Sequence, residues 1–230
     1  MGTRSQPATG AGDPGLREAG GQRLRVCVLE CVTVRGPGKS PVPIGAMQQK
    51  ILLTLLVAAG ERAVPVDRIA EELWGDSRPP RWQAGIRTLA NSLRRVAADR
   101  DFIHWSGRGY RLHRYPGTVE SDVDDMLAAT EEAGAALRAG RYSQAERAAR
   151  RALSYYGSGP WTTDYWYWGE LAADAYFVLG RSLLAQDNYL RCLLELSRAP
   201  EELDGHDGVR ACLRRARRAV STPEALPANW

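Results

Sequence analysis

The feature that most constrains the fold is a series of three helical patterns followed by a glycine-containing hairpin. The apolar spacing predicts helices over residues 47–59, 66–74 and 81–98. Gly60 and Gly75 follow the first two patterns, as glycine commonly follows the last residue of a helix. A hairpin over residues 102–112 comes next, with glycines where its turn needs a positive φ. Three helices followed by a hairpin predict a winged helix, in which the second and third helices form the helix-turn-helix.

The third predicted helix has one apolar face and one polar, basic face. The apolar face, at spacings of three, four and seven, holds Ile86, Leu89, Ala90, Leu93, Val96 and Ala97. The opposite face holds Arg87, Thr88, Asn91, Ser92, Arg94 and Arg95. Asparagine pairs with adenine and arginine with guanine in the major groove, whereas Arg87 and Arg95 flank the face and suit phosphates. These residues are the predicted recognition surface; an ordinary solvated helix face is the alternative.

The hairpin supplies a second set of candidate DNA contacts. They are His104, Ser106, Arg108 and Arg111. Arg108 is at the tip of the turn, from where an arginine can enter a narrow minor groove. The alternatives without a DNA contact are that Arg108 is an ordinary surface arginine and that His104 is a partly exposed strand residue. Trp74 and Trp105 are expected in the core.

Charge divides the chain into two parts. Residues 1–116 hold 18 Arg and Lys against 10 Asp and Glu, whereas residues 117–230 hold 13 against 17. A basic part beside an acidic part suggests two domains with different partners, and the basic part suits a polyanion. We expect a disordered tail at 1–22, a DNA-binding winged helix at 23–116 with short strands between Leu24 and Ile44, and a helical domain at 117–230.

The second part has a wholly helical pattern from Val119 onward. Leu137, Gly140, Tyr142 and Ala145 are spaced as in a tetratricopeptide helix pair, with small residues that let two helices approach. Ser143 with Glu146 three residues later predicts a capping box. Trp161, Trp166 and Trp168 form an aromatic cluster that suits either a partner surface or helix packing.

Several classes of protein are excluded. No apolar run is long enough to span a membrane, and the N-terminus has no apolar core of a signal peptide, so we expect a cytoplasmic protein. No catalytic constellation, metal-ligand pattern or cofactor motif is present, so we expect no enzyme, no metal and no cofactor. Residues 33–40 resemble a phosphate-binding loop, but prolines follow where that loop needs a helix. Cys27 and Cys31, if in one strand, would face the core together.

Three stretches carry a resemblance to a known family. Residues 62–75 read RAVPVDRIAEELWG, residues 92–95 read SLRR, and residues 107–112 read GRGYRL. In this order they resemble the actinobacterial antibiotic regulatory proteins, which join a response-regulator-type winged helix to a bacterial transcriptional activation domain. The resemblance covers about Leu24 to Ala219. The chain departs from it at Met47-Gln48-Gln49, where the family usually has Lys-Gln-Arg.

The resemblance implies a fold and a function. It implies an antiparallel sheet before the helices and a tetratricopeptide-like domain after the wing. It also implies a pathway-specific activator of a secondary-metabolite cluster. Such an activator binds double-stranded DNA at direct repeats near the −35 region as a homodimer, and recruits the RNA polymerase holoenzyme. Two alternatives stay open: a protein-interaction module whose winged helix no longer binds DNA, and a repressor on the same fold.

Overall fold

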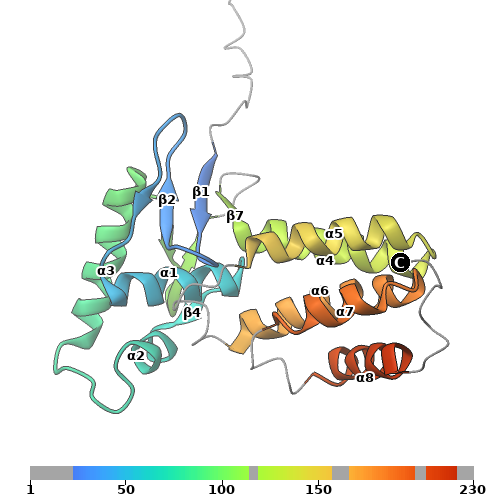
Figure 1. Cartoon of the computed structure of the whole chain (residues 1–230). Coiled ribbons are helices and arrows are strands. Elements are labelled where there is room, and N and C mark those ends of the chain that lie inside the picture. Colours follow the sequence, from blue (N-terminus) through green and yellow to red (C-terminus); the bar gives the residue numbers. More distant parts are fainter. Residues whose placement is uncertain (1–22, 114–118, 157–165, 200–205, 222–230) are drawn as a thin grey trace, which may run out of the picture.

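The structure, a computed structural model, describes residues 23–113, 119–156, 166–199 and 206–221 (Figure 1). The expected N-terminal tail therefore lies outside the described residues. The elements up to the end of the wing are β1 (Leu24–Cys27), β2 (Thr33–Arg35), β3 (Val42–Pro43), α1 (Met47–Ala59), β4 (Val64–Pro65), α2 (Val66–Trp74), α3 (Trp82–Ala97), β5 (Ile103–Trp105) and β6 (Gly109–Leu112). Those that follow are β7 (Val119–Ser121), α4 (Asp122–Arg138), α5 (Tyr142–Tyr155), α6 (Trp166–Ala185), α7 (Tyr189–Leu196) and α8 (Asp207–Ser221).

The N-terminal strands form one sheet with a strand from beyond the wing. Its order is β3-β2-β1-β7, with β1 antiparallel to β2 and parallel to β7. Leu24 pairs with Val119 and Val26 with Ser121. The sheet before the helices was expected, but β7 was not, because the pattern from Val119 onward was interpreted as wholly helical. The short strand β7 therefore attaches the start of the helical part to the N-terminal sheet.

A bend between β1 and β2 separates the first two cysteines. Cys27 ends β1 and is half-buried, whereas Cys31 lies in the bend and is exposed. The two cysteines are therefore not in one strand, and the condition under which both would face the core is not met. Val28 and Leu29 fill the core at the bend instead, with no exposed area.

The buried carboxylate of Asp122 holds this bend in place. It accepts hydrogen bonds from the backbone N–H groups of Val28, at 2.9 and 3.0 Å to its two oxygens, and of Leu29, at 2.9 Å. Burial raises the pKa of the Asp122 carboxyl above its ordinary value, while these hydrogen bonds oppose the rise. Asp122 is the first residue of α4, so the contact fixes that helix against the β1–β2 bend.

The three helices of the first part match their predicted ranges to within one residue. α3 buries Ile86, Ala90, Leu93 and Ala97, which confirms the predicted apolar face. Leu52, Leu53 and Leu56 of α1 are wholly buried, and so is Ile69 of α2. Because α1 contacts both α2 and α3, the three helices enclose one core and leave the opposite face of α3 open.

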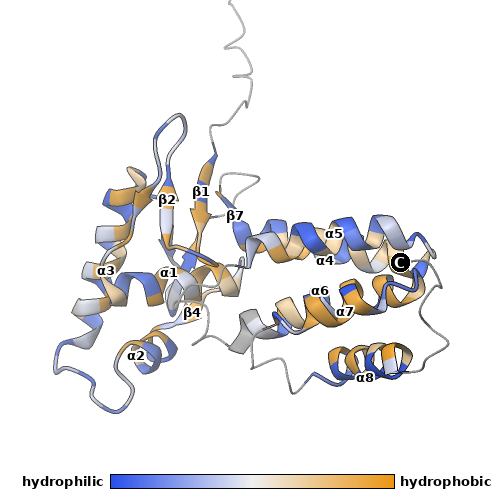
Figure 2. Ribbon diagram, in the orientation of Figure 1, coloured by the Kyte–Doolittle hydropathy of each residue, from blue (hydrophilic) through white to orange (hydrophobic). Residues whose placement is uncertain are grey.

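The second part packs helix against helix, beginning with the pair α4 and α5. Gly140 has a φ of +70° in their connection, and Ala133, Ala136, Ala145, Ala148 and Ala149 allow close approach. In Figure 2 the hydrophobic residues of α8 lie toward α6, and Val209, Cys212 and Ala216 are buried. Across the described residues, no helix is both long and apolar enough to span a membrane.

One predicted helix cap is wrong and another is present. Ser143 donates to Gln186 Oε1 at 3.1 Å, and Arg141 is the N-cap of α5 without a side-chain hydrogen bond. The capping box occurs at Ser121 and Asp124, at the start of α4. The spacing of Ser143 and Glu146 fits the motif, but α5 already begins at Tyr142, so Ser143 lies inside the helix.

Candidate nucleic-acid interface

The open face of α3 displays four of the six predicted residues. Arg87, Thr88, Asn91 and Arg95 are exposed, whereas Ser92 and Arg94 are half-buried. Thr88 donates its hydroxyl to the carbonyl of Ala84 at 3.0 Å. The exposed residues follow at spacings of three and four, so they lie along one side of the helix. The structure therefore presents two arginines, an amide and a hydroxyl side by side.

The N-terminal end of α3 is fixed against α2. Gly85 lies beneath the Trp74 ring, and a Cβ there would lie 3.4 Å from Trp74 Cη2. Arg78, in the connection, stacks over the Trp82 ring at 5.6 Å from its centroid and lies 3.6 Å from the Asp67 carboxylate. These contacts set the angle between the two helices of the helix-turn-helix.

Ser92 faces α1 and has a partner within the protein. Gln49 Nε2 donates to Ser92 Oγ at 2.8 Å. Gln49 was not among the predicted site residues, because no sequence pattern places its side chain against α3. The departure at Met47-Gln48-Gln49 therefore puts an amide beside the recognition face.

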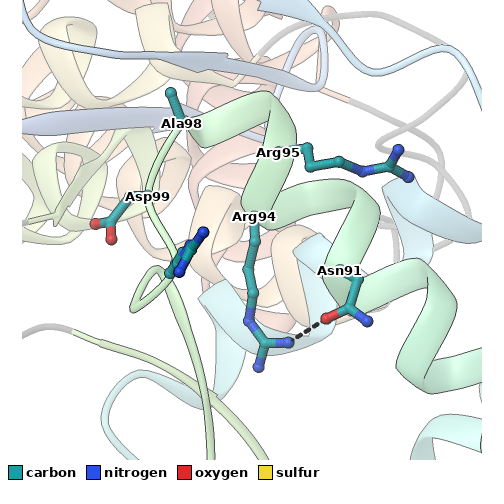
Figure 3. Close-up of a pocket in the computed structure, with 6 residues that line it drawn as sticks. Asn91, Arg94, Arg95, Ala98 and Asp99 are labelled. Atoms are coloured by element: carbon teal, nitrogen blue, oxygen red, sulfur yellow. Dashed lines mark hydrogen bonds between the residues drawn. The ribbon is translucent and has the colours of Figure 1, made fainter.

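Arg94 connects α3 to the wing (Figure 3). Its Nε and Nη2 atoms donate to the carbonyl of Ile103 at 2.9 and 2.6 Å, and its Nη1 donates to Asn91 Oδ1 at 2.6 Å. The guanidinium therefore holds the first residue of β5 and the amide of Asn91 at once. The predicted base contact by Arg94 stays a prediction.

A hollow opens beside this group, at the C-terminal end of α3. Figure 3 shows Asn91, Arg94 and Arg95 along the helix and the chain beyond it turning past them. The lining residues are Asn91, Arg94, Arg95, Ala98, Asp99 and Arg100. Three arginines around one hollow favour an anion over a neutral ligand. Arg100 was missed by sequence reasoning, although its place soon after Arg94 and Arg95 was a usable signal.

The wing is a three-stranded sheet in the order β4-β6-β5. β4 was not predicted, and it pairs Val64 with Tyr110. Gly109 permits this pairing, since a Cβ there would lie 2.1 Å from the Val64 carbonyl oxygen. Gly107 has a φ of +84° in the turn, as the sequence predicted, whereas Gly109 lies in β6 without the positive φ that was also expected there. Arg108, between the two glycines, is exposed at the tip.

The remaining wing candidates differ in exposure. His104 and Ser106 are exposed, and Ser106 N donates to the Gly109 carbonyl at 3.0 Å. Arg111 pairs with His104 across the hairpin and is half-buried. Trp105 was expected in the core but is 45% exposed and packs edge-on against Tyr110. That prediction is wrong because only Ile103, at the start of β5, reaches the core, whereas Trp105 is the last residue of the strand, beside the exposed turn.

The proposed aromatic partner surface lies largely beyond what the structure describes. Trp161 is outside the described residues, and Trp166 and Trp168 are placed only by the backbone of α6. Within the described ranges, no group of three His, Cys, Asp or Glu residues could hold a metal ion.

The chain is similar in sequence to proteins that are named as regulators. No family model matches the chain. The regulatory protein AfsR of Streptomyces griseus is 30% identical over 110 residues, which are 45% of this chain and 11% of that protein. AfsR of Streptomyces coelicolor is 31% identical over 147 residues, or 62% of this chain and 14% of that protein. The transcriptional regulatory protein EmbR of Mycobacterium tuberculosis is 30% identical over 119 residues, or 50% of this chain and 30% of that protein.

A solved structure agrees with the fold. Mycobacterium tuberculosis EmbR in complex with a low-affinity phosphopeptide superposes with a TM-score of 0.55 and 22% identity, over 86% of this chain and 65% of that one. The predicted fold class, a winged helix followed by a helical domain, is thereby confirmed. The chain is similar to AfsR and EmbR over part of its length, in agreement with the resemblance to the actinobacterial antibiotic regulatory proteins. It spans less than a third of the length of these curated relatives.

Proposed function

We propose that this chain is a DNA-binding transcription regulator that inserts α3 into the major groove. The observation that carries the proposal is the exposed row of Arg87, Thr88, Asn91 and Arg95 on a helix whose other face is buried. A helix-turn-helix presents its second helix in this way. Relatives named as regulatory proteins, none of them as an enzyme, support the same class.

The wing and the flanks of α3 supply the phosphate and minor-groove contacts. Arg87 and Arg95 reach the backbone on either side of the groove, and Arg108 at the wing tip enters the adjacent minor groove. The basic excess of residues 1–116 adds a sequence-independent attraction, which weakens steeply as salt displaces it.

The family resemblance gives the finer proposal. The chain activates a secondary-metabolite cluster, binds direct repeats near the −35 region as a homodimer, and contacts RNA polymerase through its helical part. The acidic balance of residues 117–230 fits a protein partner for that part better than DNA.

A gel shift with the purified chain and its own flanking promoter fragments tests the function. It is run at two salt concentrations with excess non-specific competitor. The proposal predicts a band that resists competitor and weakens steeply with salt. Footprinting then tests for paired direct repeats, and transcription in vitro separates activation from repression.

Absence of any competitor-resistant band on flanking and on randomised DNA would overturn the proposal. In that case the helical part would carry the function, and the chain would be interpreted as a protein-interaction module rather than a transcription regulator.

A further inference from the structure

The carbonyl oxygen of Asn91 already has a partner within the protein. Arg94 Nη1 lies 2.6 Å from Asn91 Oδ1. A guanidinium has only donors, so the amide atom that faces it must be the oxygen. The chemistry of the pair therefore fixes which way the Asn91 amide points.

Arg94 is itself anchored on the wing, so the position of its guanidinium does not depend on Asn91 alone. Its Nε and Nη2 both donate to the carbonyl of Ile103, at 2.9 and 2.6 Å. Figure 3 shows the Arg94 side chain extended beside Asn91, with the dashed hydrogen bond joining them. Because Arg94 is half-buried and anchored on β5, it presents a fixed donor to the amide.

The amino group of Asn91 is wholly available to a ligand, whereas Arg94 takes one of the two acceptor sites of its oxygen. Asn91 is exposed, and among the described residues its Nδ2 atom donates to no protein acceptor. The residue thus presents two N–H donors on the open face of α3.

We propose that Asn91 reads DNA as a hydrogen-bond donor and selects guanine over adenine, with Arg94 as the residue that positions it. This inference rests on the proposed function, since it concerns the same α3 surface. It reverses the expectation from residue type alone, in which asparagine pairs with adenine and Arg94 with guanine.

The edges of the bases explain the selection. Adenine offers an acceptor at N7 and a donor at N6, so a bidentate asparagine must use both its amino group and its oxygen. Guanine offers two acceptors, N7 and O6, which an amino group alone can serve. Oδ1 has a second lone pair, but an adenine N6 donor would have to share the oxygen with the positively charged guanidinium of Arg94, whereas guanine meets only the amino group.

Selection from a randomised duplex library tests the inference. The full chain is used to select bound sequences, and Asn91→Ala then identifies the base position whose preference depends on Asn91. Affinities of the selected duplex with guanine or adenine at that position are measured for each variant. The wild-type chain is expected to favour guanine by about tenfold, the discrimination of one good base contact.

Arg94→Gln and Arg95→Gln form the matched pair. Both remove one positive charge from neighbouring positions of α3, but only Arg94 bonds Asn91. Arg94→Gln is expected to abolish the guanine preference or shift it toward adenine, whereas Arg95→Gln lowers affinity for both duplexes equally. A second variant covers the case in which Arg94→Gln loosens the wing. Asn91→Asp keeps an acceptor for Arg94 but replaces the amino group, with its two donors, by an oxygen. It is therefore expected to lose the guanine preference.

Each outcome decides the inference. An adenine preference in the wild-type chain, or an unchanged preference in both Arg94→Gln and Asn91→Asp, overturns it while the regulator function stands. Loss of affinity in Asn91→Ala without any change in base preference also overturns it, since Asn91 would then contact only phosphate. Failure to select any sequence overturns the function as well.

Discussion

At the scale of single residues, polar side chains that bond distant backbone groups hold the β1–β2 bend and the wing in position. Asp122 holds the bend at Val28 and Leu29, and Arg94 holds the start of β5. Each pairs with backbone groups that would otherwise be left without partners. Neither role follows from residue type, since both depend on a contact with a distant part of the chain.

Replacement of Asp122 should destabilise the protein strongly. Asp122→Ala leaves the N–H groups of Val28 and Leu29 without acceptors in a buried setting, at a cost of about 2–4 kcal/mol in the free energy of unfolding. Asp125→Ala is the matched control, because it removes only the partly exposed ion pair with Arg25, and should cost no more than about 1 kcal/mol. Urea denaturation measures both, and equal losses would contradict the role of Asp122.

The cysteines should differ in reactivity with their burial. Burial raises the pKa of the Cys192 thiol to about 12, and also raises the pKa of Cys212. Between pH 9 and pH 12 the folded chain keeps a proton at Cys192 that the unfolded chain releases, so this thiol lowers stability as the pH rises.

Timed alkylation at pH 8.5 with mass spectrometry measures that difference. The exposed Cys31 should be labelled well before Cys192 and Cys212, which should react only on unfolding. Labelling of Cys192 at the rate of Cys31 in the folded chain would show that α7 does not pack as described.

At the scale of elements, the wing depends on two glycines for different reasons. Gly107 needs its positive φ but has open space around it, whereas Gly109 needs the absence of a side chain beside β4. The turn chemistry of Gly107 was predictable from the sequence. The need at Gly109 was not, because β4 has only two residues and pairs across the wing.

Alanine at these positions should separate the two effects. Gly107→Ala is expected to cost about 1–2 kcal/mol of stability, the strain of a left-handed backbone. Gly109→Ala is expected to cost more than about 2 kcal/mol, since a Cβ at 2.1 Å from the Val64 oxygen forces β4 away from β6. Thermal unfolding of both variants measures the order, and a larger loss for Gly107→Ala would contradict this account of the wing.

The helices were predictable and the contacts between distant elements were not. Apolar periodicity, together with the glycines that follow α1 and α2, predicted the three helices to within a residue. β7 was missed because three residues carry no periodic signal and its partner, β1, is far away in the sequence. The capping box was placed at Ser143 rather than Ser121, since the same residue types fit both helix starts.

The same limit applied to the candidate site. The exposed face of α3 followed from the spacing of its polar residues. Three features could not be predicted without the fold: the exposure of Trp105, the hydrogen bond between Gln49 and Ser92, and the hydrogen bonds of Arg94 to the Ile103 carbonyl. Each depends on how α1, α3 and β5 are packed.

At the scale of the whole molecule, one of the two core clusters crosses the junction between the two parts, and the other lies within the helical part. A single cluster of buried residues runs from Leu24 to Ala175 and includes Met126 and Ala129 of α4. The ion pairs of Arg23 with Glu120 and of Arg25 with Asp125 lie over the same junction. The division into domains at residues 116 and 117 therefore stays a prediction, since the structure joins the parts through β7 and α4.

The chain should unfold in one cooperative transition. A core continuous across the junction leaves neither part able to open without exposing the other. Urea unfolding followed by tryptophan fluorescence and by far-ultraviolet circular dichroism should give coincident curves. Two separated transitions would show that the winged helix and the helical part are independent units.

The most direct test of the central claim compares two charge reversals on opposite parts of the chain. Arg87→Glu with Arg95→Glu alters the open face of α3, and Arg214→Glu with Arg217→Glu makes the same change of charge on exposed positions of α8. Affinity for a selected duplex is measured at one salt concentration. We expect the α3 variant to lose at least about tenfold in affinity and the α8 variant to lose little. Equal losses, or a loss confined to the α8 variant, would contradict the assignment of α3 as the DNA-binding helix.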